Sequence, residues 1–350
     1  MHRTPNSLFV QHVIVFITLL SALLLLTACG GGSSGSGGNN GGALPGAPTD
    51  IKFNDIAENS TSTLVTVRGG WQIADNTIFY STDGGSTWNP ANGCPGGMNT
   101  VTYQYVINAW LAGGALYDTG TQVHTPQLCT STDGITWTVL KTYPAYPDTT
   151  IHVVGADIMG IAIATGPNVG DCFLVINDYT GFNGLPQNWD NPTDCTGLPV
   201  PVMDQRIIAS TFYVVGGPTP SGAYSWDGAT WNAGPDTPAL RTMQFISTDG
   251  ASYFYAVGGG NGLIRISNDY VTWTEPTTPT TANINYIESN FSSSAIAVGD
   301  GGLLLSSTDA STWTLQSSGT SANLHAAVWD NTNARFVIVG ENNTTVFFTP

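Results

Sequence analysis

Short apolar runs alternate with turn residues along most of the chain. After residue 30 these runs are rich in Val, Ile, Thr and aromatic residues, and Gly, Pro, Asn, Asp and Ser bound them. No long stretch with a helical period follows residue 30. The pattern predicts antiparallel β-strands joined by short turns. Residues 13–26 differ, because they are almost continuously apolar.

A turn of the form Ser-x-Asp followed by Trp recurs at the ends of these runs. The intervals between successive Trp residues are 49, 52, 42, 42 and 40 residues, which is the length of a four-stranded propeller blade. The turns contain Asp83 with Trp88, Asp133 with Trp137, the degenerate Asp178 with Trp189, Asp227 with Trp231, Asp269 with Trp273, and Asp309 with Trp313.

A second repeat is a strand that ends in glycine. Six copies precede the six turns, and a seventh lies at Arg335–Gly340. The six are Leu64–Gly69, Trp110–Gly113, Ile161–Gly166, Phe212–Gly216, Tyr253–Gly258 and Ala295–Gly299. The sequence therefore predicts an all-β fold: a single seven-bladed β-propeller of four-stranded antiparallel blades over residues 43–350. We expect residues 43–50, or a segment close by, to complete the seventh blade, because an unclosed ring would expose a strand edge.

These turns resemble the Asp-box, or bacterial neuraminidase repeat, whose pattern is S-x-D-x-G-x-T-W. Ser81–Trp88 fits it in full, and most other copies lack the inner Gly. The Asp carboxylate of such a turn accepts backbone N–H bonds across the hairpin, and the Trp covers it. The resemblance implies that the boxes lie on the outer rim, away from any active centre. We therefore interpret their Asp and Trp residues as structural.

The amino terminus resembles a bacterial lipoprotein signal. The apolar run ends in Leu26-Thr27-Ala28-Cys29, which is similar to the lipobox. The resemblance implies that residues 1–28 are a signal peptide and that Cys29 carries the lipid. Residues 29–42 are a Gly/Ser/Asn-rich tether after that cysteine. Gly30 after the cysteine implies the outer membrane of the cell envelope.

The other cysteines are candidates for disulfide bonds, as an even number in an exported chain suggests. Four cysteines allow three connectivities, and sequential pairing is preferred: Cys94 with Cys129, and Cys172 with Cys195. We expect no metal site, because there is no CxxC pair and histidines are few. No cofactor is expected.

Charge restricts the partners. Asp and Glu number 24 against 8 Lys and Arg, giving a net charge of −16. Nucleic-acid binding requires clustered basic residues, so we expect no nucleic-acid partner. The expected partner is an envelope protein or a glycan, and the expected membrane contact is the lipid on Cys29 alone.

Long loops of the second blade are the candidate ligand face. They carry Tyr117 and His124 in one loop and Tyr143 and Tyr146 in the next. Function concentrates in long loops on a rigid scaffold. The alternative is that these tyrosines pack against the blade.

The repeat resembles those of sialidase-like, photosystem-assembly-factor-like and sortilin-like propellers. Sialidases capture a carboxylate with clustered Arg, and this chain shows no Phe/Tyr-Arg-Ile-Pro motif before its boxes. A G-x-S-x-G nucleophile motif is also absent, and no catalytic residue is assigned. We expect a non-enzymatic lipoprotein whose propeller is a protein- or glycan-binding scaffold. The alternative is a carbohydrate-active enzyme, since a glycosidase needs only two opposed carboxylates.

Overall fold

The computed structural model describes most of residues 53–350. The described ranges are 53–59, 61–69, 77–156, 159–165, 172–178, 189, 193–194, 202–208, 211–216, 222–226, 231–233, 240–250, 253–268 and 272–350. Apart from Ile208, these residues belong to one compact unit (Gly38–Ile207 and Thr211–Pro350). The predicted signal peptide (residues 1–28), Cys29, the predicted tether and residues 43–50 lie outside the described residues. Within the described ranges, no helix has the length and apolar character needed to span a membrane.

The described strands form seven antiparallel sheets, five of four strands and two of three. The first three sheets are β1 (Phe53–Glu58), β2 (Leu64–Arg68), β3 (Ile78–Ser81) and β4 (Asn89–Pro90); β5 (Gly97–Gln104), β6 (Ala109–Asp118), β7 (Val123–Ser131) and β8 (Thr138–Thr142); and β9 (Thr150–Ala156), β10 (Met159–Thr165), β11 (Cys172–Asp178) and β12 (Thr193–Asp194).

The remaining four sheets continue the same order. They are β13 (Val202–Ile208), β14 (Thr211–Gly216), β15 (Gly222–Trp226) and β16 (Trp231–Ala233); β17 (Leu240–Ser247), β18 (Tyr253–Gly259) and β19 (Ile264–Ser267), with η1 (Gly260–Gly262); β20 (Ile284–Ser289), β21 (Ala295–Gly299), β22 (Leu304–Ser307) and β23 (Thr314–Gln316), with η2 (Asp300–Gly302); and β24 (Leu324–Asp330), β25 (Arg335–Gly340) and β26 (Thr345–Phe348). The prediction of an all-β fold with four-stranded antiparallel sheets is confirmed.

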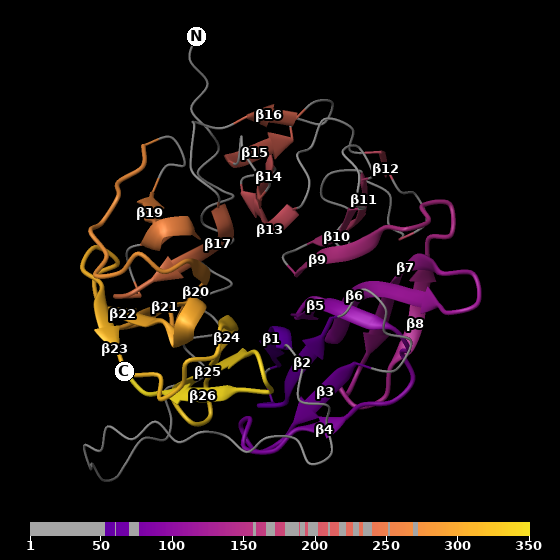
Figure 1. The fold of residues 1–350 in the computed structure, drawn as a ribbon, viewed down its shortest axis with the longest axis horizontal. Helices are drawn as coiled ribbons and strands as arrows, with labels where there is room; N and C mark the ends of the chain where they lie inside the picture. The colour runs from indigo at the N-terminus through magenta and orange to yellow at the C-terminus, as the bar shows by residue number, and fades with distance from the viewer. Residues whose placement is uncertain are drawn as a thin grey trace. The chain divides into compact units, whose positions relative to one another are not determined.

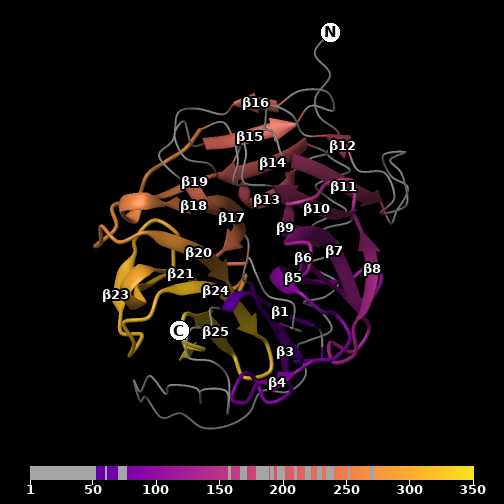
Figure 2. The ribbon, with the colours of Figure 1, turned by 45° about the vertical axis from the view of Figure 1, so that its right-hand side comes forward.

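Neighbouring sheets contact each other mainly through their first strands. Contacts join β1 to β5, β5 to β9, β17 to β20, and β20 to β24. Strand β24 in turn packs against β1, so the last sheet lies beside the first (Figure 1). Figure 2 shows the same order of sheets from a second direction. Strand β26 has no fourth strand beside it among the described residues, and the segment expected there falls outside them.

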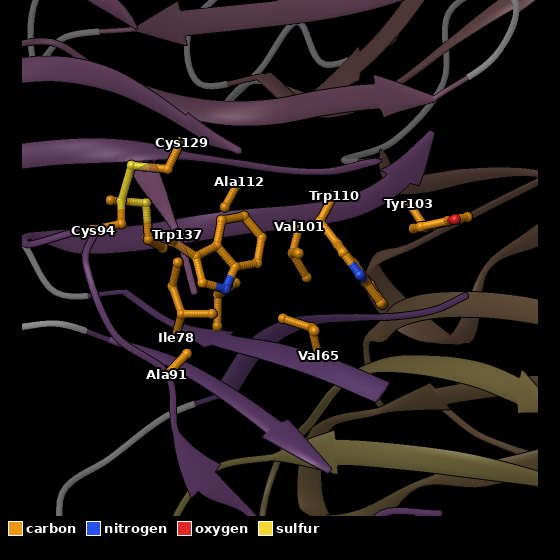
Figure 3. Packing of buried hydrophobic residues seen from close by; sticks show 12 residues of the cluster. Val65, Ile78, Ala91, Cys94, Val101, Tyr103, Trp110, Ala112, Cys129 and Trp137 are labelled. Carbon is orange, nitrogen blue, oxygen red and sulfur yellow. A yellow bond between two sulfur atoms is a disulfide. The ribbon is translucent and has the colours of Figure 1, made fainter. Parts of the chain in front are cut away.

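Tryptophans of the Ser-x-Asp turns fill the interfaces between sheets. Trp137 follows β7 yet packs with Val65 and Ile78 of the first sheet (Figure 3). Trp313 likewise packs among isoleucines of the fifth sheet. Trp88 contacts Phe53 and donates a hydrogen bond to Thr345 of the last sheet (3.1 Å). Burying so large a ring contributes about 2–3 kcal/mol, so each turn stabilises a joint between neighbouring sheets.

Aspartates hold these turns closed. The Asp83 carboxylate accepts hydrogen bonds from N and Oγ1 of Thr87 (2.9 and 2.7 Å) and from the Ser81 hydroxyl (2.7 Å). Asp133 and Asp309 accept the corresponding backbone bonds. Asp227 and Asp269 lie outside the described residues. At Asp83, Asp133 and Asp309 the carboxylate therefore has a structural role in the hairpin.

Cysteine placement agrees with the preferred pairing where it is described. Cys94 and Cys129 form a disulfide bond at one end of the cluster in Figure 3. The bond joins the segment after β4 to β7, and so ties the first sheet to the second. The proposed partner of Cys172, Cys195, lies outside the described residues.

The repeated glycine has a steric cause. In four sheets, a glycine of the second strand pairs with the residue just before a β-bulge in the first strand. These glycines are Gly114, Gly259, Gly299 and Gly340. In two sheets they lie one position after the predicted Gly113 and Gly258. A Cβ on Gly299 would lie far inside contact distance of the Asn283 carbonyl oxygen, and one on Gly340 would meet the Asn323 oxygen in the same way. The glycine is therefore needed for close backbone approach.

We expect Gly299→Ala to lower the free energy of unfolding by about 2–3 kcal/mol, because the added methyl collides with backbone that cannot move alone. The matched control is Gly260→Ala in the neighbouring sheet, where the new Cβ meets Asn283 Oδ1 at an ordinary 3.6 Å. That variant should stay within about 0.5 kcal/mol of the parent. Urea unfolding measures both, and equal losses would contradict the steric explanation.

Candidate functional site at the bulged ends of the inner strands

Tyr117 and His124 form one small cluster near the end of the β6–β7 hairpin. Their ring centroids are 4.7 Å apart. His124 is buried, and its Nδ1 lies 3.6 Å from the Asp148 carboxylate, which also accepts a bond from the His124 backbone N–H (3.2 Å). The cluster fixes the following loop, because the Asp148 N–H in turn donates to the His124 carbonyl (2.9 Å).

Tyr143 and Tyr146 form a separate cluster, over Phe173 of β11. Tyr143 is only 3% exposed and donates its hydroxyl hydrogen to the Trp189 carbonyl oxygen (3.1 Å). The two tyrosine rings lie 4.8 and 4.5 Å from the Phe173 ring. For Tyr143 the structure supports the packing alternative: this ring joins the second sheet to the third and offers no surface to a ligand.

A different set of residues lies near the starts of the first strands of the sheets. We call these first strands the inner strands. In six of the seven sheets, the pairing between the first and the second strand contains one β-bulge near the beginning of the first strand. The extra residue is polar in every case: Asn54, Asn99, His152, Arg241, Asn285 and His325. A bulge re-aims one side chain out of the regular alternation. We call these six residues the bulge set.

Members of the bulge set reach across to the next sheet. Asn99 donates hydrogen bonds to Oγ1 of Thr150 (2.9 Å) and to the Ile151 carbonyl (3.0 Å) on β9. Asn285 donates to the Leu324 carbonyl on β24 (3.0 Å). Arg241 donates to Oδ1 of Asn285 (2.7 Å). These bonds link successive inner strands in one direction, sheet by sheet.

Asp300 is the centre of the network between the fifth and seventh sheets. It opens the turn between β21 and β22, and its carboxylate accepts bonds from Asn283 (2.7 Å) and Asn285 (2.8 Å). Burial opposes ionisation of this carboxyl group. The two amide bonds and the positive charges of Arg241 and His325 outweigh that effect and lower the pKa of Asp300. A negative charge is thus held beside Arg241.

The seventh sheet repeats this arrangement with a glutamate. Asn323 donates to the Glu341 carboxylate (3.2 Å), which opens the turn between β25 and β26 and lies 3.7 Å from the His325 ring. Asn323 also accepts a bond from the Gly301 backbone N–H (2.7 Å). Arg241, His325 and the two carboxylates therefore lie along one edge that is partly open to solvent.

Sequence reasoning missed this site, although a signal was present. The segments Ala282-Asn283-Ile284-Asn285 and Ala322-Asn323-Leu324-His325 precede equivalent strands and share an Ala-Asn-apolar-polar order. Alternation alone places the last residue of each segment on a regular strand face. The bulge that redirects it is visible only once the strand register is known.

One carboxyl pair lies at the opposite end of the inner strands. Glu58 ends β1, and both it and Asp330 at the end of β24 are buried. Burial and the nearby charge of Asp330 raise the pKa of Glu58 to about 7. Asp330 is bound within its own turn by Thr332 and Asn333. Among the described residues, no group of three His, Cys, Asp or Glu side chains is placed to hold a metal ion.

Comparison with solved structures identifies the fold. The chain is similar to YCF48 bound to D1 peptide (17% identity, TM-score 0.61, 89% of this chain and 95% of that chain). It is similar to YCF48 from Cyanidioschyzon merolae (14%, TM-score 0.58, 89% and 98%). It is also similar to the WD40 β-propeller domain of Doa1 (12%, TM-score 0.59, 89% and 97%). No protein-family model and no curated protein sequence matches the chain. The protein is a β-propeller.

The raised pKa of Glu58 predicts that the free energy of unfolding depends on pH. Its carboxyl titrates near 4.5 in the unfolded chain and near 7 in the folded protein. Between these values the unfolded state loses the proton first, so the stability of the folded state falls as the pH rises. Glu58→Gln removes this loss. Urea unfolding should show the variant gaining on the parent by on the order of 2 kcal/mol from about pH 4 to about pH 8. A difference that does not change with pH would contradict the assignment.

Proposed function

We propose that this protein is a lipid-anchored cell-envelope protein whose propeller binds a segment of a partner protein and catalyses no reaction. The binding surface is formed by Arg241, Asn285 and His325 of the bulge set with Asp300 and Glu341. We also assign the Ser-x-Asp turns to the Asp-box type of repeat. That assignment is supported by the bonds of Asp83, Asp133 and Asp309 to the backbone of their own hairpins.

Arg241 carries the proposal for the site. The Arg241 side chain is partly exposed. Within the described residues, Nη1 of its guanidinium group, which carries two of the five N–H groups, donates a hydrogen bond to Asn285. Asn285 fixes the direction of the guanidinium group because it is itself held by Asp300 and Leu324. An oriented arginine binds carbonyl and carboxylate oxygens with paired hydrogen bonds. A peptide segment supplies such oxygens from its backbone and from acidic side chains.

The comparisons support this kind of ligand. One similar structure is described as YCF48 with a D1 peptide bound. Both that protein and this chain are propellers, and propellers present ligands with loops and strand ends gathered from several blades. The likeness supports binding of a protein segment here, and it leaves the sequence of that segment to experiment.

A glycoside hydrolase is the competing function. Glu58 with Asp330 supplies a protonated carboxyl group beside a second carboxyl group, the pairing that such an enzyme needs. Both side chains are buried, however, and Asp330 is occupied by its own turn and lies 3.8 Å from Arg335. A sugar must reach both groups, so burial favours a structural role for the pair.

Arg241→Ala should reduce binding of the partner about tenfold or more, since one charge-assisted hydrogen bond is worth about 1.5–3 kcal/mol. The assay is recovery of a crosslinked envelope partner on the purified protein, quantified by mass spectrometry. Arg265→Ala is the matched control, because that arginine lies on β19 and pairs with Glu275 (3.0 Å). Equal recovery by both variants, or recovery of glycan without protein, would contradict the proposed function.

The lipid anchor is tested separately. Metabolic labelling with a clickable palmitate analogue should label the exported parent chain, and Cys29→Ser should abolish the label and release the protein from membranes. Cys172→Ser serves as the matched cysteine control and should keep the label. A chain that stays membrane-bound and labelled without Cys29 would overturn the lipoprotein assignment.

A further inference from the structure

The end of the sheets opposite the bulge set carries two kinds of hairpin. In the first sheet, Glu58 pairs with Leu64, and Leu64 pairs with Ser81. The β1–β2 turn and the Ser-x-Asp turn therefore lie at the same end. The second and sixth sheets have an equivalent pairing. In the seventh sheet the β24–β25 turn lies at this end. We call this end the hairpin face.

Exposed apolar side chains gather on two hairpins of this face. The β5–β6 turn presents Tyr105, Val106 and Ile107 in succession, with Val106 45% exposed. The β20–β21 turn presents Phe291, which is 41% exposed. The corresponding turns of the first and seventh sheets consist mainly of polar residues. Exposed apolar residues clustered at hairpin tips are a feature of interaction surfaces.

The backbone at Phe291 supports a functional reading of this tip. Its φ is 57°, in the left-handed region that bulky residues rarely adopt. The preceding Asn290 side chain accepts bonds from the backbone of Ser292, Ser293 and Ser294, which holds the turn in this shape. The fold thus accepts a strained conformation at a residue whose ring points to solvent instead of the core.

The charge of the hairpin face is strongly negative. Asp83, Asp133 and Asp309 are exposed there, and their turn hydrogen bonds lower the pKa of each despite the opposing effect of burial. Glu288 lies near enough to Tyr105 to raise the pKa of that phenol, after burial and Glu58.

Few basic side chains are described on the same face. Arg335 is one of them, and its Nε lies 3.8 Å from the Asp330 carboxylate. Arg68, Lys141 and Arg241 occur toward the other ends of their strands. The charge of the described chain is therefore divided unevenly between the two ends of its sheets.

We propose that the hairpin face is a second interaction surface, formed by Tyr105–Ile107 and Phe291 among exposed carboxylates, and that it takes a basic amphipathic segment of a partner protein. Apolar side chains of that segment cover the hairpin tips, and its Lys or Arg residues face the carboxylates. A lipid surface fits less well, because the aspartates at the same end of the sheets would meet anionic headgroups.

The test measures binding of a labelled helical peptide with one Leu face and one Lys face, against a peptide with Glu in place of Lys. The protein is the exported full chain carrying Cys29→Ser, so that no sample bears lipid. We expect the Lys peptide to bind, the Glu peptide to fail, and affinity to fall between about 50 and about 300 mM NaCl. Val106→Ser with Ile107→Ser should weaken binding about tenfold.

Matched variants separate the alternatives. Leu315→Ser removes an even more exposed apolar side chain (61%) on the outer strand β23, and should leave peptide binding unchanged. Arg241→Ala should also leave it unchanged, so a failure of the bulge site is distinguishable from a failure of the hairpin face. Equal binding of the Lys and Glu peptides would overturn the proposal. Binding of phosphatidylcholine vesicles in place of peptide, or self-association lost with Val106 and Ile107, would overturn it too.

Discussion

A close approach between a glycine of the second strand and a carbonyl oxygen at the start of the first strand, present at Gly114, Gly299 and Gly340, is the constraint on which this structure depends. At Gly299 and Gly340 no side chain fits, since the oxygens of Asn283 and Asn323 occupy the place of a Cβ. Gly299 and Gly340 pair with Ile284 and Leu324, and the β-bulge lies at the next residue of each first strand. The bulge redirects the side chains of Asn285 and His325. A steric requirement on the second strand thus determines which polar groups the first strand presents.

The same contact explains what the sequence could and could not predict. Regular spacing of Trp and Gly was sufficient for the all-β fold and for the four-stranded antiparallel sheets, because each repeat is one structural unit. In four sheets the position of the glycine was predicted to within one residue, yet its structural role was not. A glycine that ends a strand looks like a turn residue, whereas Gly299 is needed by a partner strand whose register the sequence does not state.

The sequence also failed to predict which side chains are buried at the candidate ligand face. Loop length predicted Tyr117 and His124 to lie in a long loop, whereas they pair directly across the regular β6–β7 hairpin. Loop length also carries no information on burial. Tyr143 lies in a hydrophobic cluster with Leu111, Leu128 and Ile151, because the loop folds back over the neighbouring sheet. Arg241 and Asn285, by contrast, belong to strands that look regular in sequence. Their convergence arises from contacts between sheets, which single-sequence patterns do not encode.

The aspartates of the Ser-x-Asp turns have two roles. They close the hairpin, as the sequence predicted, and they also carry negative charge at the surface. Donation from backbone N–H groups closes each hairpin, and the same donation stabilises the ionised form of the carboxyl group. A residue retained for the turn therefore also keeps a full negative charge at the surface. Because the turn recurs from sheet to sheet, these charges accumulate at one end of the described sheets, whereas Arg68 and Arg241 lie toward the other end. The electrostatic asymmetry of the molecule is in this sense a consequence of its repeat, and it arises without any residue dedicated to binding.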